Sequence, residues 1–289
     1  TIASHQADER RDPASITKLM TAYVVFGALR QKSIVPSQMV SVSERAWRAE
    51  GSRMFIEPRK SVSVDELLHG MIVQSGNDAS IALAELVAGS EPAFVERMNQ
   101  EAKRLGMAST QFVNATGLAD PQHWSTAGDI ATLAQAVIRD YPEYYPLYSL
   151  REYRYNKITQ PNRNRLLWTD PYVDGMKTGH TDAAGYCLVA SAAREFPNLA
   201  QTGTGGGKRR LLSVLLNTTS ANARADESQR LLNWGFTAFE TVRLFEAGQA
   251  IVSPPVWKGT SSEAHLGTTG ALFVTVPKGD AAKLQTRVE

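Results

Sequence analysis

The apolar positions in the first half of the chain recur with the spacing of α-helices. Over residues 13–31 such a stripe is made by Leu19, Tyr23, Phe26 and Leu29. Asp12 is a good N-cap and Pro13 suits the first helical position, so a helix is predicted from Pro13 to Gln31. Acidic, Ser/Thr or Glu-Pro start signals open four further predicted helices, over 65–74, 78–88, 91–105 and 126–139.

The pattern changes from about Arg151. The stretch "REYRYNKI" alternates, and "GYCLVASAA" and "LLSVLLN" are short β-rich runs divided by glycine clusters. A last helix is predicted over 225–242, and the following "AIVSPPVWKG" and "ALFVTVPKG" are strand-like and broken by proline. We therefore expect an α/β (α+β) domain over 1–242 and the start of a β-rich second domain over 243–289, cut off at Glu289.

Composition excludes several function classes. The chain of 289 residues is 43% hydrophobic and 21% charged, and its net charge of +2 gives no case for a nucleic-acid partner. Its longest apolar stretches, such as "MTAYVVFGAL", are too short to span a bilayer. Cys187 is the single cysteine and reads as a small core residue, while His69 and His123 lack metal-ligand spacing. No metal and no cofactor are expected.

The glycine-rich stretch "QTGTGGGKRR" does not fit a phosphate-binding loop. Thr202 and Arg209 occupy positions where the Gly-x-x-x-x-Gly-Lys-Ser/Thr motif needs other residues. We expect a hairpin loop over 202–207, to which no function is assigned.

Candidate chemistry begins in "PASITKLM". Residues i and i+3 of a helix share a face, so the amine of Lys18 can reach the hydroxyl of Ser15. A serine needs a base to become a nucleophile, and a lysine acts as that base only when it is neutral. Burial or a second cation lowers a lysine pKa, and Lys177 in "VDGMKTGH" is a candidate for that cation.

A third element lies between the two lysines, at a junction between predicted helices. It is "QSGNDAS", which contains Ser75 and Asn77. Each of the three motifs alone is weak, and Ser15 with Lys18 alone would be interpreted as a helix cap beside a solvated lysine. Their order, Ser-x-x-Lys, Ser-x-Asn and Lys-Thr-Gly, separated by 60 and 102 residues, makes a chance origin untenable.

This ordered set resembles the penicillin-recognising serine enzymes. The surrounding segments, including "LLHGMIVQSGNDAS", "FVNATGL" and "VDGMKTGHTDAAGYCLVASA", are similar to the low-molecular-mass penicillin-binding proteins that act as D-alanyl-D-alanine carboxypeptidases. The resemblance covers nearly the whole chain. It implies a β-lactamase/transpeptidase-like domain with an antiparallel sheet flanked by helices, a first strand missing before Thr1, and a second domain mostly missing after Glu289.

The resemblance implies a role for each motif residue. Ser15 would be the acylated nucleophile, Lys18 its general base, and Ser75 the proton relay to the leaving amine. Substrate binding would fall to Asn77, Lys177, Thr178, Gly179, His180 and Arg163. Lys177 would also keep Lys18 neutral, and the missing Cβ of Gly179 would let an extended peptide lie along the strand. The backbone N–H groups of Ser15 and His180 would form the oxyanion hole.

Arg163 would support the Ser75 loop and the carboxylate pocket, although a solvated strand arginine is the alternative. The expected partners are a peptidoglycan peptide ending in D-Ala-D-Ala and β-lactams as covalent inhibitors. The enzyme would be exported to the periplasmic face of the cytoplasmic membrane, with membrane contact only through a C-terminal helix outside this chain.

Two other functions stay open at this level. A β-lactamase needs a glutamate-activated water, and the one Glu-x-x-x-Asn considered, Glu152 to Asn156, lies inside a predicted strand and too close to Lys177. A penicillin-sensing module that is acylated once would normally be attached to a transmembrane segment, and none is visible in the sequence.

Overall fold

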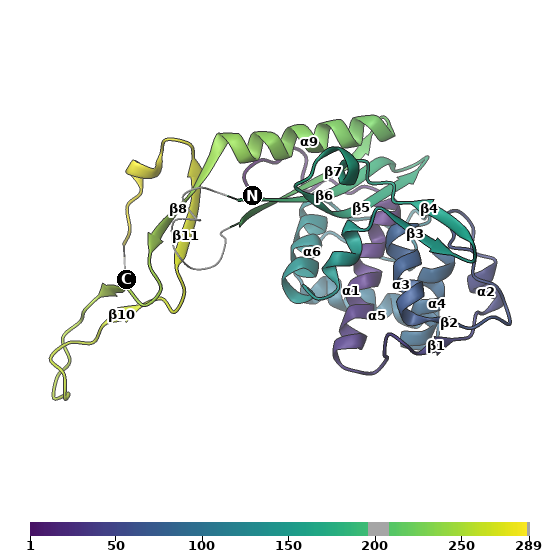
Figure 1. Cartoon of the computed structure of the whole chain (residues 1–289), viewed down its shortest axis with the longest axis horizontal. Helices are drawn as coiled ribbons and strands as arrows, with labels where there is room; N and C mark the ends of the chain where they lie inside the picture. Colours follow the sequence, from purple (N-terminus) through teal and green to yellow (C-terminus); the bar gives the residue numbers. More distant parts are fainter. Residues whose placement is uncertain (196–207, 288–289) are drawn as a thin grey trace. The chain divides into compact units, whose positions relative to one another are not determined.

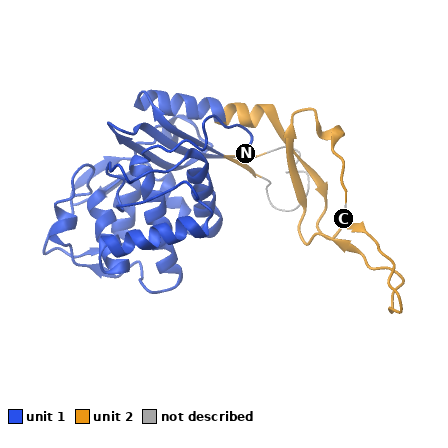
Figure 2. Cartoon of the chain, turned by 180° about the vertical axis from the view of Figure 1, so that it is seen from behind, with its two compact units in different colours: residues 1–192, 212–231 blue, residues 193–211, 232–289 orange. Residues whose placement is uncertain are grey.

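The structure is a computed structural model that describes residues 1–195 and 208–287. The chain divides into two compact units (Figure 2). Unit 1 comprises residues 1–192 and 212–231, and unit 2 comprises residues 193–211 and 232–289. The domain division at Val242 stays a prediction. The predicted loop over 202–207 lies outside the described residues.

Unit 1 begins with helices, as the hydrophobic pattern predicts. They are η1 (Ala14–Thr17, a 3-10 turn), α1 (Lys18–Arg30), α2 (Glu44–Trp47), α3 (Val64–Val73), α4 (Asn77–Ala88), α5 (Glu91–Arg104), α6 (Ala127–Asp140), η2 (Tyr145–Ser149) and α7 (Leu166–Thr169). Side chains cap several of their first turns. Ser63 and Glu66 form a capping box on α3, and Ser90 and Thr126 cap α5 and α6.

Helix α1 is the centre of the helical layer (Figure 1). It contacts α3, α4, α5 and α6, and every residue from Lys18 to Phe26 is buried. A helix that is apolar on all sides has no solvent face to present, so this one is enclosed by its neighbours. The lysine at its first position is therefore placed inside the protein.

The predicted helix over 13–31 is wrong at its start. Ser15 lies in the 3-10 turn η1, which leads into α1 at Lys18. Ala14 has a φ of +46°, outside helical geometry, and its N–H donates to Oδ1 of Asp12 at 2.7 Å. Pro13, and not Asp12, is the N-cap of this turn, and the nucleophile candidate lies ahead of the regular helix.

The strands of unit 1 follow. They are β1 (Met39–Val40), β2 (Val62–Ser63), β3 (Glu152–Tyr155), β4 (Ile158–Pro161), β5 (Val173–Thr181), β6 (Gly185–Glu195) and β7 (Lys208–Thr218), the last two continuing into unit 2. Strands β5, β6 and β7 form a sheet in that order, and β5 pairs antiparallel with β6. Asn156 and Lys157 have φ of 47° and 66°, which suits the two-residue turn joining β3 to β4.

The last predicted helix ends earlier than expected. Helix α9 spans Ala221–Ala238, and residues 239–242 belong to strand β8 (Phe239–Phe245), in which Val242 pairs with Val274 of β11 (Leu272–Pro277). Pairing with a distant strand overrides the local helical spacing. Strands β9 (Ala250–Val252) and β10 (Leu266–Gly267) and the turn η3 (Ala281–Lys283) complete the β-rich second unit.

No helix within residues 1–195 and 208–287 combines the length and apolar character needed to cross a membrane.

Candidate active site

Lys18 and Ser15 lie within hydrogen-bonding distance at the junction of η1 and α1. Nζ of Lys18 lies 3.0 Å from Oγ of Ser15, 2.7 Å from Oδ1 of Asn77 and 2.6 Å from the carbonyl oxygen of Thr116. The lysine side chain is only 1% exposed. A neutral amine in this position donates its two protons to Asn77 and Thr116 and accepts the third hydrogen bond from Ser15. The geometry therefore suits proton removal from the serine.

Ser75 and Asn77 lie where α3 passes into α4, as the sequence predicts. Ser75 has a φ of +61°, and Asn77 is the first residue of α4. The amide Nδ2 of Asn77 donates to the carbonyl oxygen of Glu50 at 2.6 Å, and its backbone N–H donates to that of Ser52 at 2.7 Å. These two bonds fix the Asn77 side chain so that its Oδ1 faces Lys18.

Lys177 approaches the same region from the sheet. It lies well inside β5. Its Nζ donates to Oγ of Ser75 at 2.9 Å and to the carbonyl oxygen of Thr178 at 2.9 Å. Three segments far apart in the sequence thus supply the hydrogen-bonded side chains of the site, which are those of Ser15, Lys18, Ser75, Asn77 and Lys177.

Burial dominates the electrostatics of both lysines. Burial first and then the charge of Arg163 lower the pKa of Lys18 from 10.5 to about 7, against the opposing effect of the Asp78 carboxylate. The pKa of Lys177 is also well below its usual value, because of burial first and then the charges of Lys18, Arg163 and Arg224.

The expectation that Lys177 keeps Lys18 neutral stays a prediction. Burial and then the charge of Arg163 are the main causes that lower the pKa of Lys18. The charge of Lys18 in turn lowers the pKa of Lys177, which is 3% exposed, and repulsion between two ammonium groups acts on both of them.

Gly179 lies where β5 passes the Ser15 turn. A Cβ at this position would lie 3.0 Å from the carbonyl oxygen of Pro13 and 3.1 Å from Cβ of Ala14. The missing side chain thus faces η1 and allows β5 to approach the Ser15 turn closely. Its predicted role in letting a peptide lie along the strand stays a prediction.

Arg163 and His180 are placed at the edge of the site. Nη1 of Arg163 donates to Oγ of Ser52 at 2.6 Å, so the arginine supports the Ser75–Asn77 turn indirectly, through the loop that binds Asn77. The exposed imidazole of His180 packs on Tyr186, with ring centroids 4.0 Å apart. This contact is consistent with a role for the His180 backbone rather than for its ring.

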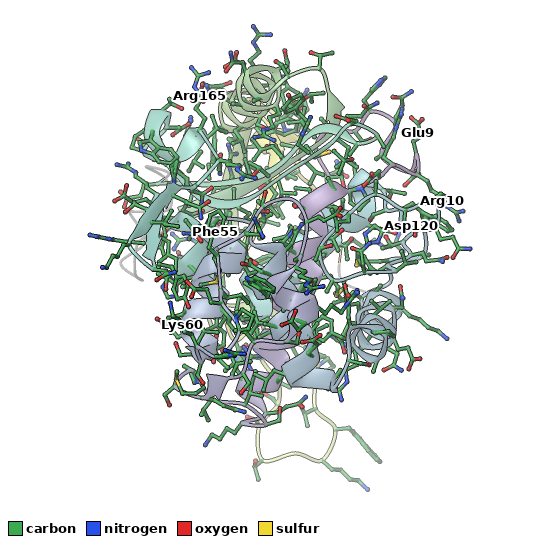
Figure 3. The ribbon with its side chains drawn as sticks, turned by 90° about the vertical axis from the view of Figure 1, so that its right-hand side faces the viewer. Glu9, Arg10, Phe55, Lys60, Asp120 and Arg165 are labelled. Atoms are coloured by element: carbon green, nitrogen blue, oxygen red, sulfur yellow. The ribbon has the colours of Figure 1, made fainter. Side chains whose placement is uncertain are left out.

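Two loops reach the site from different parts of the chain. Residues 48–61 contribute the carbonyls that hold Asn77, and residues 113–123 contribute the Thr116 carbonyl that holds Lys18. Phe55 of the first loop and Asp120 of the second lie on opposite sides of the face shown in Figure 3.

Several buried positioning groups escape sequence reasoning. The Asp78 carboxylate accepts backbone N–H groups of Met54, Phe55, Ile56 and Ala79 at 2.8–3.2 Å, which shapes the first loop. Arg224 of α9 donates to the carbonyl oxygen of Gly179 at 2.9 Å and so fixes the backbone of β5. Neither residue belongs to a motif, although the acidic residue directly after Asn77 was a usable signal for Asp78.

His123 supports the turn between Ser15 and Lys18. Its Nδ1 accepts the N–H of Val113 at 3.1 Å, so Nε2 carries the proton and donates to Oγ1 of Thr17 at 2.7 Å. Burial lowers the His123 pKa to about 4. The histidine considered as a metal ligand from the sequence is thus a neutral hydrogen-bonding residue of the core.

The part of the chain that the structure describes contains no cluster of three or more His, Cys, Asp or Glu side chains able to hold a metal ion. Cys187 is buried in β6, where burial raises its thiol pKa to about 11. A reactive thiolate is not expected there.

Comparison with known proteins identifies the family. The model of the D-alanyl-D-alanine carboxypeptidase family, peptidase S11, matches residues 1–202. The chain belongs to this family. A second model, for the C-terminal domain of penicillin-binding protein 5, matches residues 239–289.

Individual relatives agree with this assignment. The D-alanyl-D-alanine carboxypeptidase DacC of Escherichia coli is 45% identical over 98% of this chain and 70% of the relative. The crystal structure of penicillin-binding protein 5 from Haemophilus influenzae is 42% identical, with a TM-score of 0.89 over 100% of this chain and 82% of that one. Penicillin-binding protein D2 from Listeria monocytogenes in an ampicillin-bound form is 30% identical, with a TM-score of 0.70 over 81% and 91%.

The comparisons confirm the predicted family, the transpeptidase-like fold with a β-rich second domain, and the serine-type D-Ala-D-Ala carboxypeptidase class. No observation favours a β-lactamase or a sensing module. In this carboxypeptidase Glu152 is exposed on β3, and the Asn156 amide donates to Glu57 at 2.7 Å, so the Glu-x-x-x-Asn pair has no place in the site.

Proposed function

We propose that Ser15 attacks the carbonyl carbon between the last two D-alanines of a peptidoglycan stem peptide, while neutral Lys18 takes the hydroxyl proton. The C–N bond then breaks, and the proton that Lys18 took passes through Ser75 to the leaving D-alanine amine. Water later attacks the resulting Ser15 ester, which regenerates the hydroxyl and releases the shortened peptide as a carboxylate.

The observation that carries the proposal is the hydrogen-bond set of Lys18. A buried lysine with two uncharged oxygen acceptors and one serine hydroxyl has a pKa of about 7, so a large part of it is neutral near neutral pH. That state is what a general base for Ser15 requires.

The substrate would be oriented by its two ends. Asn77 would bind the amide on the amino-terminal side of the scissile bond. Lys177 and Thr178 would bind near the terminal carboxylate, whose negative charge would favour the ammonium form of Lys177. The backbone N–H groups of Ser15 and His180 would stabilise the oxyanion, and β-lactams would acylate Ser15 in the same way.

Peptidoglycan lies outside the cytoplasmic membrane. The proposed location of the enzyme is therefore the periplasmic face of that membrane.

The test is intact mass after penicillin treatment, with the modified peptide mapped, beside D-alanine release from a D-Ala-D-Ala peptide. Wild type should gain one adduct on Ser15 and release D-alanine, and Ser15→Ala should do neither. Ser33→Ala, a serine exposed after α1, is the control and should behave like wild type. An adduct mapped to Ser75 would overturn the assignment.

A further inference from the structure

A hollow of about 340 Å³ lies beside the catalytic region and has no part in the proposed reaction. It is lined by Trp47 at the end of α2, by the loop 48–61 and by the β3–β4 hairpin. Trp47, Phe55 and Ile158 give it an apolar surface and are 38%, 39% and 40% exposed. Arg53, Glu57 and Asn156 add a guanidinium, a carboxylate and an amide.

The outward position of Phe55 is built into the fold (Figure 3). Phe55 has a φ of +68°, a left-handed conformation that is strained for an aromatic residue. Oδ2 of the fully buried Asp78 accepts its N–H at 2.8 Å and that of Ile56 at 3.2 Å, which holds the strained turn. The bond from Asn156 to Glu57 ties the hairpin to the same loop.

The hollow is continuous with the site through a short piece of chain. Glu50 and Ser52, whose carbonyls bind Asn77, immediately precede Arg53 and Phe55. In the proposed reaction Lys177 and Thr178 would bind the carboxyl end of the substrate and Asn77 its preceding amide. The amino-terminal part would then leave the site past Asn77, whose side chain donates to the carbonyl oxygen of Glu50 in the loop 48–61.

We propose that the hollow binds a sugar ring of the glycan strand that carries the stem peptide, an N-acetylated hexosamine. The proposal rests on the proposed function, since the glycan is attached at the amino end of the stem peptide. A pyranose presents an apolar face of C–H groups that packs on aromatic rings. Its hydroxyl and acetamide groups match the acid, amide and guanidinium at the rim.

The experiment compares D-alanine release from two substrates with the same pentapeptide, one free and one linked to its N-acetylated disaccharide. Wild type should have a higher kcat/KM on the disaccharide substrate. Trp47→Ala should lose about fivefold to tenfold in kcat/KM on that substrate, because one aromatic stacking contact is removed, and should keep its rate on the free pentapeptide. Trp168→Ala, an exposed tryptophan on α7 outside the hollow, should change neither rate.

A second measurement does not depend on turnover. The disaccharide without peptide is titrated into the protein while the indole N–H signals of its five tryptophans are followed by NMR. The signal that Trp47→Phe removes should shift, and that of Trp168 should stay. An unmoved Trp47 signal together with equal wild-type rates on both substrates would overturn the sugar site. If Trp47→Ala loses kcat/KM equally on both substrates, the hollow binds a residue of the peptide and not the sugar. If the Trp47 signal shifts but wild type releases no D-alanine from either substrate, the proposed function is contradicted and the sugar site is still supported.

Discussion

The low pKa of Lys18 predicts how acylation depends on pH. Only the neutral amine takes the Ser15 proton, so the rate of acylation by penicillin should rise with pH along a limb centred at about 7. Moving a lysine pKa from 10.5 to about 7 corresponds to roughly 5 kcal/mol against the ammonium form. At pH 7 an unperturbed lysine would be neutral in only about one molecule in 3,000, against about half of the molecules here.

Arg163 is a neighbouring cation whose charge lowers the pKa of Lys18, and removing that charge tests its effect. Arg163→Gln abolishes a positive charge that disfavours the Lys18 ammonium, so the pKa of Lys18 should rise and the limb should move to higher pH. Lys18→Arg should fail to acylate at every pH, because a guanidinium is not deprotonated in this range. Arg165→Gln is the matched control, since this exposed arginine donates to Asn222 and is no cause of the Lys18 shift.

The assay is the acylation rate constant for a fluorescent penicillin between pH 5.5 and 10, with the midpoint of the limb as the result. A midpoint is insensitive to a uniform loss of affinity, so it separates the charge of Arg163 from any contact it makes with the ligand. Near wild-type acylation by Lys18→Arg, or a limb unmoved in Arg163→Gln, would refute the reasoning.

Three further predictions concern buried groups around the site. Between pH 7 and 10 only the unfolded state protonates Lys18, so the free energy of unfolding should rise with pH in wild type relative to Lys18→Met, by up to about 1.4 kcal/mol per pH unit. Urea unfolding of both proteins measures this difference, and parallel plots of unfolding free energy against pH would contradict it. Wild type should lose stability as pH falls from 6.5 toward 4, where unfolded His123 is protonated and folded His123 is not, and His123→Phe should lack this loss. Gly179→Ala should slow penicillin acylation, because its Cβ would lie 3.0 Å from the Pro13 oxygen and displace η1, whereas an unchanged rate would show that the strand can yield.

The side-chain chemistry of the site could be predicted from the sequence, because it is carried by residue types at recognisable spacings. Ser15 and Lys18 share a helical turn, and the ordered motifs located Ser75, Asn77 and Lys177, which the structure brings together. The amphipathic helices were predictable for a similar reason, since their caps and apolar stripes are local.

The backbone contribution could not be predicted. The backbone carbonyl of Thr116, 98 residues from Lys18 in the sequence, accepts a hydrogen bond from its amine. Because every residue has a backbone carbonyl, the residue type at position 116 does not indicate this contact. The end of α9 was predicted too late for a related reason. The spacing of residues 239–242 is compatible with a helix, and only their pairing with β11 decides for a strand.

The two acceptors of Lys18 explain why the fold can keep this amine neutral. Both are uncharged oxygens, one from Asn77 and one from the backbone of Thr116. A carboxylate in either place would favour the ammonium form and raise the pKa. The nearby buried carboxylate of Asp78 instead accepts four backbone N–H groups, so much of its negative charge is used in shaping the loop 48–61. The chain thus satisfies the two N–H groups of Lys18 without a compensating anion, which leaves the nitrogen lone pair directed at Ser15.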